Sequence, residues 1–140
     1  MTAPQSRPLR LLFVCVENAN RSQMAEAFAR RLGGEAVEAW SAGSRPSASV
    51  NPKAVAAMAE LGYDLSAHRP TSVQDLPPGE FDVLVTLGCG EACPAVPARR
   101  RLDWQIPDPR DLDPEAFRKV RDRVRRQVAA LLAEYGCARE

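Results

Sequence analysis

The sequence of 140 residues has almost no net charge, few aromatic residues, one histidine and no long apolar run. Its 19 Lys and Arg residues against 18 Asp and Glu residues give a net charge of +1, so no overall field recruits nucleic acid or an anionic membrane. No run approaches the roughly 18 apolar residues that span a bilayer, and the start of the chain lacks the apolar core of a signal peptide. These absences favour a cytoplasmic protein whose cysteines stay reduced.

The scarcity of histidine also restricts the chemistry of the chain. His68 is the single histidine, so a Cys–His pair of the protease type is not expected, and a zinc site would lack repeated ligand spacing. We therefore expect no metal site and no tightly bound cofactor. His68 itself follows a polar turn and is expected at the surface or as a capping residue.

The hydrophobic content is 45%, mostly aliphatic, which suits the core of an α/β protein and argues against disorder. Residues 1–8 are expected to form a flexible N-terminal arm, and residues 9–136 a single domain that can bury a real core. Apolar runs typical of buried strands alternate with amphipathic stretches typical of helices. This alternation predicts a parallel sheet with helices on both faces, where ligands bind beyond the carboxyl ends of the strands.

Apolar periodicity and capping signals place the individual elements. Strands are predicted over four short apolar segments, Leu9–Val14, Ala36–Trp40, Phe81–Leu87 and Leu102–Gln105. Helices are predicted from near Ser22 to Gly33, from Pro52 to Leu61 and after the cap Asp113-Pro114, with a single helical turn at 72–76 and a turn-rich loop at 41–47. The chain therefore reads as a series of strand–helix units.

One stretch, Cys15-Val-Glu-Asn-Ala-Asn-Arg-Ser22, joins the first strand to the first helix. The backbone N–H groups of such a loop form an anion nest, and the helix adds the positive end of its dipole. Arg21 supplies a planar fork of donors that matches a tetrahedral oxyanion. Beside this positive potential, Cys15 should ionise easily to a thiolate nucleophile. The predicted site is a covalent oxyanion site whose binding residues are Val16, Glu17, Asn18, Ala19, Asn20, Arg21 and Ser22.

Simpler interpretations of this stretch stay open at this point. Cys15 can be a small core hydrophobe, and Ser22 can be the N-cap of the helix instead of a hydrogen-bond donor to the thiolate. Glu17 places an acid in an anion loop and must point outward or weaken binding. Asn18 is expected to bridge backbone groups of the loop and not to contact the substrate.

A second group of thiols lies in Gly88-Cys-Gly-Glu-Ala-Cys-Pro94. If this loop is helical, Cys89 and Cys93 have Cβ atoms about 5–6 Å apart, and a disulfide needs about 3.8 Å. A bridge across so short a loop stabilises a fold by only about 2 kcal/mol. The pair therefore suits a redox switch better than a structural bridge, with zinc binding or an inert pair as the alternatives.

These motifs resemble the low-molecular-weight tyrosine phosphatase superfamily. The Cys15–Ser22 stretch and Asp108-Pro109 carry the resemblance to the superfamily. Three further segments resemble its arsenate reductase branch, namely Phe13-Val-Cys15, Arg21-Ser-Gln-Met-Ala-Glu26 and Ser41-Ala-Gly43. The resemblance implies a phosphatase-like catalytic domain with four parallel strands, the first strand lying between the second and third. It also implies that Asp108 is the general acid.

The arsenate reductase branch implies a role for each cysteine of the predicted site. Cys15 would attack arsenate, Cys89 would attack the adduct and release arsenite, and Cys93 would take over the disulfide and present it to thioredoxin. The catalytic residues would then be Cys15, Arg21, Cys89, Cys93 and Asp108. Phosphatase activity could remain as a side reaction.

Alternatives to this function come from positions in the same segments where this sequence differs from the usual pattern of the family. The Cys89–Cys93 spacing resembles reductases that use mycothiol, a low-molecular-weight thiol, in place of thioredoxin. A phosphotyrosine phosphatase usually carries tyrosine after Asp-Pro, whereas Arg110 stands here. A third interpretation is a sensor without catalytic activity, which binds an oxyanion and changes the redox state of its thiols. Asn20 replaces a second loop cysteine of many relatives, and Cys137, near an end expected to fray, receives no role.

Overall fold

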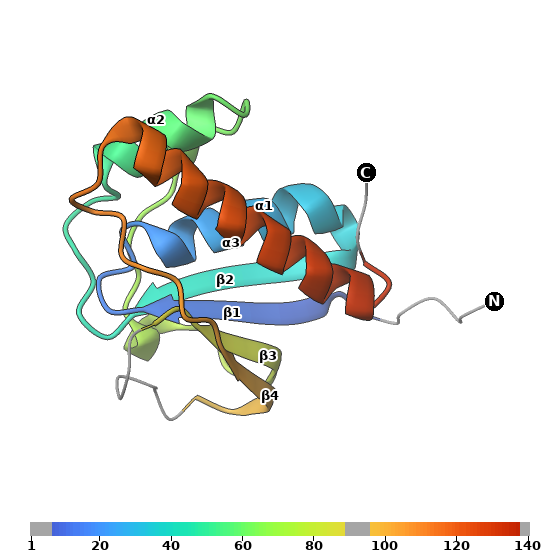
Figure 1. Cartoon of the computed structure of the whole chain (residues 1–140). Helices are drawn as coiled ribbons and strands as arrows, with labels where there is room; N and C mark the ends of the chain where they lie inside the picture. The colour runs from blue at the N-terminus through green and yellow to red at the C-terminus, as the bar shows by residue number, and fades with distance from the viewer. Residues whose placement is uncertain (1–6, 89–95, 138–140) are drawn as a thin grey trace.

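The computed structural model describes residues 7–88 and 96–137, and within them the chain forms one sheet of four parallel strands. The strands are β1 (Leu9–Cys15), β2 (Val37–Gly43), β3 (Phe81–Thr86) and β4 (Ala98–Asp103), in the spatial order β2-β1-β3-β4 (Figure 1). The predicted fold class is confirmed, with β1 between β2 and β3. Because every neighbouring pair is parallel, the carboxyl ends of all four strands meet at one edge of the sheet.

Three α-helices pack on one face of this sheet, α1 (Arg21–Gly33), α2 (Pro52–Ala59) and α3 (Pro114–Glu134). In Figure 1, α3 runs beside α1 across the sheet, and α2 lies near the beginning of α3. The apolar side chains of these helices pack with every second residue of β1, from Leu9 to Cys15. Leu12 and Val14 face the opposite side, where the one-turn helix Val73–Asp75 and its neighbours cover the sheet.

The predicted capping residues begin two of the helices. The side-chain oxygen of Asn51 accepts a hydrogen bond from the Lys53 amide at 2.9 Å, and that of Asp113 accepts one from the Ala116 amide at 2.8 Å. In both helices proline follows the cap directly, where its missing N–H costs nothing. The starts of α2 and α3 are thus determined by local sequence.

Two strand boundaries differ from the prediction by three residues or more. Ser41–Gly43, predicted as loop, continues β2, because the backbone of β1 pairs with it as far as Cys15 opposite Gly43. β4 begins at Ala98, four residues earlier than predicted, and so includes the Arg99–Arg101 triplet. Residues of β4 alternate between half-buried and exposed, which is how charged residues occupy the edge strand of a sheet.

Cys137 is packed in the core and does not lie in a frayed segment, which corrects the prediction. Gly136 follows α3 with φ of +69°, and the amide of Cys137 donates to the carbonyl of Leu132 at 2.8 Å. This left-handed turn is a common helix C-cap that folds the next residue back onto the helix. Cys137 therefore belongs to the main hydrophobic core.

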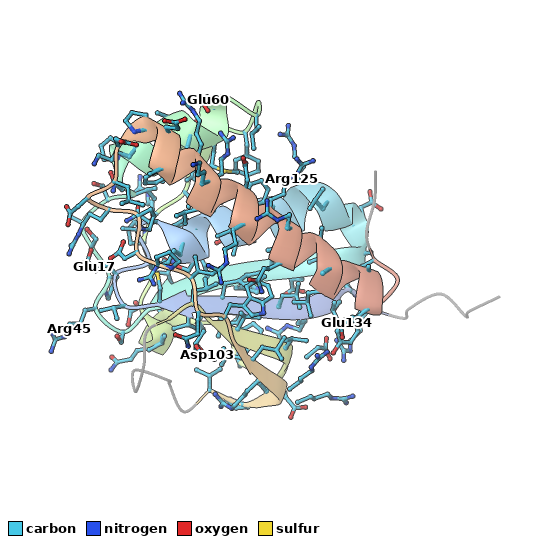
Figure 2. All side chains as sticks on the ribbon, viewed as in Figure 1. Glu17, Arg45, Glu60, Asp103, Arg125 and Glu134 are labelled. Atoms are coloured by element: carbon cyan, nitrogen blue, oxygen red, sulfur yellow. The ribbon has the colours of Figure 1, made fainter. Side chains whose placement is uncertain are left out.

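Charged side chains of α3 mostly lie on its outer side, as Arg125 does in Figure 2. Arg121 is an exception: it is buried and donates to the Glu60 carboxylate at 2.7 Å and to the Ala57 carbonyl at 2.9 Å. These contacts tie α3 to the end of α2. Nowhere in 7–88 or 96–137 does a helix have the length and apolar character needed to cross a membrane.

Candidate active site

The loop after β1 rests on the end of β2. A Cβ atom on Gly43 would lie 2.5 Å from the carbonyl oxygen of Val16, so only glycine permits this approach. The carbonyls of Val16, Glu17 and Ala19 accept hydrogen bonds from amides of the 45–51 segment, at 2.8 to 3.1 Å. In a trans peptide the carbonyl and the next N–H point in opposite directions, so the following amides of the loop face away from that segment. The loop is held through its carbonyls, which leaves those N–H groups for another acceptor.

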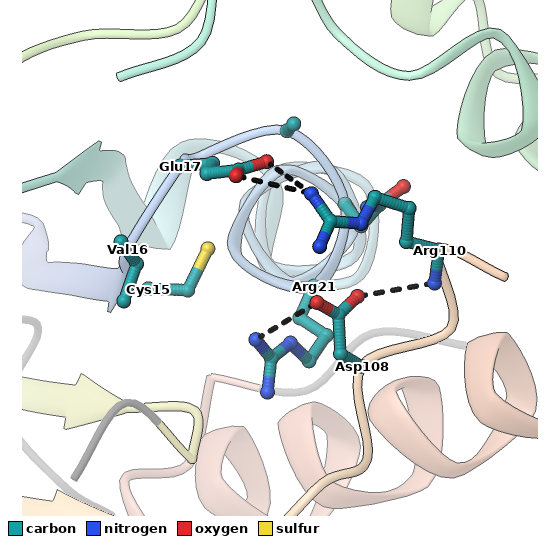
Figure 3. A pocket seen from close by; sticks show the side chains of 8 residues that line it. Cys15, Val16, Glu17, Arg21, Asp108 and Arg110 are labelled. Atoms are coloured by element: carbon teal, nitrogen blue, oxygen red, sulfur yellow. Dashed lines mark hydrogen bonds and ion pairs between the residues drawn. The ribbon is translucent and has the colours of Figure 1, made fainter. Parts of the chain in front are cut away.

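A cavity of about 210 Å³ opens at this loop. Figure 3 shows the Cys15 sulfur pointing into the space between the loop and the segment that follows β4. The residues that line the cavity come from these two segments and are Cys15, Val16, Glu17, Ala19, Asn20, Arg21, Asp108 and Arg110. The structure thus brings Asp108 to the loop at the carboxyl edge of the sheet, where the strand order predicted a site.

Hydrogen bonds orient the Ser22 hydroxyl toward Cys15. The backbone amide of Thr71 donates to Asn18 Oδ1 at 2.8 Å, which turns Asn18 Nδ2 toward Ser22 Oγ, 2.7 Å away. Since Nδ2 is a donor, Ser22 Oγ accepts there, and its own hydrogen can point to Cys15 Sγ at 2.8 Å. The Asn18 side chain therefore joins Ser22 to the backbone of Thr71, outside the loop, and not to backbone groups of the loop as predicted. The Ser22 hydroxyl is placed where it can donate to the Cys15 sulfur.

A half-buried histidine extends this chain of hydrogen bonds. Gln23 Nε2 donates to Asn18 Oδ1 at 3.0 Å, so Gln23 Oε1 faces His68 Nδ1 at 2.9 Å and accepts its hydrogen. His68 Nε2 then meets the Tyr63 hydroxyl at 2.8 Å. Desolvation lowers the pKa of His68, which favours the neutral ring. Of the two predicted roles of His68, capping is met, because its backbone N–H ends the one-turn helix Leu65–Ala67 by donating to Leu65. The surface position is wrong, because the 63–71 segment folds against α1 and the loop.

Arg21, the first residue of α1, is positioned by two carbonyl groups at the edge of the sheet. Its Nη1 donates to the carbonyl of Leu87 at 2.6 Å and to that of Ile106 at 2.9 Å. Its Nη2 lies 3.9 Å from Asp108 Oδ2. The guanidinium is thus anchored on one side and faces the cavity with the other. Gly88, with φ of +79°, lies against Arg21 and Ile106, where a Cβ atom would come within 3.0 Å of Nη1.

Asp108 stands at the outer side of the cavity, with its carboxylate about half exposed. Its Oδ1 accepts a hydrogen bond from the Arg110 amide at 3.0 Å, a turn that prolines at 107 and 109 support. The carboxylate lies beside the Arg21 guanidinium (Figure 3). A carboxyl group at this position can exchange a proton with solvent and with a ligand in the cavity.

Glu17 and Arg110 meet across the mouth of the cavity. Arg110 Nη1 lies 3.1 Å from Glu17 Oε2 and 3.4 Å from Oε1, as the dashed lines in Figure 3 mark. Glu17 thus lines the cavity and does not point outward as expected, and Arg110 balances its charge. Reading the sequence did not identify Arg110 as part of the site, because it lies 93 positions from Glu17 and no local pattern links them.

Asn20 precedes the first turn of α1 but makes no side-chain cap hydrogen bond. The alternative interpretation of Ser22 as the N-cap is therefore wrong, because α1 begins before it, at Arg21. The buried Oδ1 of Asn20 has no hydrogen-bond partner in the described part of the protein. Cys89 and Cys93, the predicted relay thiols, lie outside the described residues. Across 7–88 and 96–137, no group of three or more His, Cys, Asp or Glu side chains is placed to hold a metal ion.

Comparison with known families agrees with this geometry. The model of the family described as low molecular weight phosphotyrosine protein phosphatase matches residues 10–138, and the chain belongs to this family. Within the family, the chain is similar to proteins named arsenate reductases. A glutaredoxin arsenate reductase of Synechocystis is 37% identical over 128 residues, which are 89% of this chain and 97% of the relative.

Solved structures show the same relationship. An arsenate reductase in its phosphate-binding state superposes with a TM-score of 0.82 at 38% identity, over 89% of this chain and 97% of that chain. A thioredoxin-dependent arsenate reductase of Corynebacterium glutamicum superposes with a TM-score of 0.70 at 29% identity, over 92% of this chain and 64% of that one. These relatives share the fold over nearly the whole described chain.

Proposed function

We propose that the protein reduces arsenate to arsenite with Cys15 as the nucleophile. The observation that carries this proposal is the meeting of the Cys15 sulfur, Arg21 and Asp108 around one small cavity. Membership of the phosphatase family and similarity to relatives named arsenate reductases support the same reaction. Residues 9–136 would then form a single catalytic domain, working in the reducing cytoplasm where thiols persist.

The first step uses groups of the loop and of the cavity that it borders. Arsenate binds to the loop amides at 16–20 and to Arg21, and the Cys15 thiolate, held by the Ser22 hydroxyl, attacks arsenic. A sulfur–arsenic bond forms while one arsenic–oxygen bond breaks. Asp108 gives its proton to the departing oxygen, which leaves as water. The product is a covalent thiol–arsenate adduct of arsenic(V).

Release of arsenite requires two electrons from a second thiol. By resemblance, Cys89 attacks the Cys15 sulfur, and the electron pair of the sulfur–arsenic bond reduces arsenic(V) to arsenic(III). Gly88, the residue bonded to Cys89, lies against Arg21 at the cavity. Cys93 then attacks Cys89, frees the Cys15 thiol and leaves a Cys89–Cys93 disulfide for an external reductant.

We propose thioredoxin as that reductant, with a low-molecular-weight thiol as the alternative. One relative is named a glutaredoxin arsenate reductase and another is a thioredoxin-dependent arsenate reductase, so relatives of one fold differ in donor. Parallel assays of NADPH oxidation on arsenate, with thioredoxin, glutaredoxin or mycothiol and the matching reductases, measure which donor supports turnover. Turnover with mycothiol alone would contradict the thioredoxin proposal.

Single-turnover mass mapping tests the relay itself. Cys93→Ser should release one arsenite per protein, trap a Cys15–Cys89 bridge and fail to turn over with thioredoxin. Cys89→Ser should stop earlier, at the adduct, unless a small thiol replaces it. If both serine variants turn over normally, Cys89 and Cys93 have no part in the reaction.

A phosphatase reaction is the second candidate, because the family name and the Cys15, Arg21 and Asp108 set fit it equally well. Phosphate transfer to Cys15 followed by hydrolysis would need no second thiol. Release of phosphate from an aryl phosphate by the parent protein, with no arsenite formed from arsenate with any donor, would favour this candidate.

A further inference from the structure

The ion pair at the mouth of the cavity has no part in the reaction proposed above. Glu17 belongs to the loop after β1, and Arg110 to the segment after β4, so the pair connects the two walls of the cavity. Both side chains are about half exposed. Their charges balance each other, which offsets the repulsion that an unpaired Glu17 would exert on an anion.

The position of the pair matters because of the direction in which a leaving group departs. In a displacement at a tetrahedral centre, the leaving oxygen lies opposite the Cys15 sulfur, on the side of the acid that protonates it. Asp108 is that acid in the proposed function, and the Arg110 amide is bonded to its carboxylate. The organic group of an ester would continue outward past Asp108, to the place where Arg110 meets Glu17. An inorganic oxyanion carries only a hydrogen atom there.

We propose that the Glu17–Arg110 ion pair is a selectivity gate that admits inorganic tetrahedral oxyanions and excludes organic phosphate esters and phosphonates. This inference rests on the proposed function for the position of the reacting oxyanion. The cavity of about 210 Å³ is smaller than the roughly 300 Å³ at which pockets for larger organic ligands begin. An aryl or alkyl group can enter only after the ion pair separates.

The two partners are not equivalent. Removing the charge of Glu17 opens the gate and also takes a negative charge away from the anion site. Removing the charge of Arg110 opens the gate but leaves Glu17 unbalanced, so the affinity for every anion falls. A gate therefore predicts that the two single substitutions change anion affinity in opposite directions but change the preference between small and large anions in the same direction.

Calorimetric binding of phosphate and of benzylphosphonate to the full chain tests the gate without requiring turnover. The variants are Glu17→Gln, Arg110→Gln and the double substitution. In each, the benzylphosphonate affinity relative to that of phosphate should rise about fivefold, the change that loss of an exposed ion pair allows. The double variant should show no larger rise than either single variant, because either substitution alone removes the pair.

Arg99→Gln is the matched control. It breaks another exposed ion pair, Arg99 with Glu80 at 3.3 Å, on the edge strand and not among the residues that line the cavity. Its affinity ratio should stay at the parent value. An unchanged ratio in all three gate variants, or changes that simply add in the double variant, would overturn the gate.

Failure of the gate and failure of the proposed function give different results. If the parent binds phosphate and the ratio shifts but no arsenite forms with any donor, the gate stands and the reductase proposal falls. If arsenite forms but the ratio does not shift, only the gate falls. A parent protein that binds no phosphate would overturn the oxyanion site and the gate with it.

Discussion

Cys15 and Cys137 have nearly the same burial, 3% and 4% exposed, yet their surroundings differ completely. Cys15 is the last residue of β1, at the carboxyl edge of the sheet, where the Ser22 hydroxyl lies 2.8 Å from its sulfur. Cys137 lies near the start of β2, at the opposite end of the sheet, with carbonyl oxygens 3.6 and 3.9 Å from its sulfur. Burial raises the pKa of the Cys137 thiol, which keeps it neutral.

The comparison shows that depth of burial does not distinguish the proposed nucleophile from a core residue. The Ser22 hydroxyl lies beside the Cys15 sulfur, and a cavity gives an oxyanion access to it. Around Cys137 the neighbouring polar groups are carbonyls, which accept hydrogen bonds and therefore favour the protonated thiol. The predictions below test this contrast, beginning with the largest expected effect.

Replacing each cysteine in turn should separate catalysis from packing. Cys15→Ser should abolish arsenate reduction and any phosphatase activity, because both reactions need the same thiolate. Cys137→Ala should keep the parent activity at 25 °C. Steady-state assays of both reactions measure this, with circular dichroism to establish that each variant is folded. Activity retained in pure Cys15→Ser protein would show that the nucleophile lies elsewhere.

Asp108→Asn tests the proton donor beside Cys15. The first chemical step should slow by roughly a hundredfold or more, whereas phosphate binding should change little, because an amide cannot give up a proton. Single-turnover kinetics at saturating arsenate measure the rate, and calorimetry measures binding. If the rate is unchanged under conditions where chemistry limits turnover, Asp108 is not the proton donor and only stabilises the turn at 107–110.

Ser22→Ala removes the hydrogen bond to the Cys15 sulfur and leaves the rest of the loop in place. Hydrogen bonds to charged groups contribute about 1.5–3 kcal/mol, so alkylation of Cys15 by iodoacetamide at neutral pH should slow by about tenfold or more when this donor is lost. Cys137 in the same protein is the internal control, since it should react only after unfolding. Mass spectrometry of peptides gives both rates. Equal alkylation of Cys15 in variant and parent would contradict the role of Ser22.

Cys137→Ala should have the smallest effect, a loss of about 1 kcal/mol of unfolding free energy at neutral pH. Because the folded protein raises the pKa of this thiol, its contribution is full below the unfolded pKa of about 8.5 and is lost as pH rises through the folded pKa. The stability difference between parent and variant should therefore shrink in alkaline solution. Urea unfolding at neutral pH and at about pH 9.5 measures it, and a constant difference would show that the thiol does not titrate differently on folding.

Local sequence determined much of this protein. Apolar runs specified β1 and β3, and Asn51-Pro52 and Asp113-Pro114 specified the starts of α2 and α3, because these signals act between neighbours in the chain. The Cys15–Ser22 spacing likewise predicted an oxyanion loop between strand and helix, since strand, loop and helix dipole are all local. The predicted start of the edge strand β4 lies four residues after the observed one, because the arginines at its beginning are not apolar. Pairing with β3 determines where this strand begins and ends.

Only the tertiary structure decided how distant residues complete the site. His68 reaches the Cys15 loop through Gln23, and Arg110 meets Glu17, because separate segments converge on one edge of the sheet. Gly136 folds Cys137 into the core, where the sequence predicted a frayed end. The physical reason is the same in each case. Hydrogen bonds, ion pairs and burial depend on distances in space, and a pattern in the chain specifies those distances only for residues that are close in sequence.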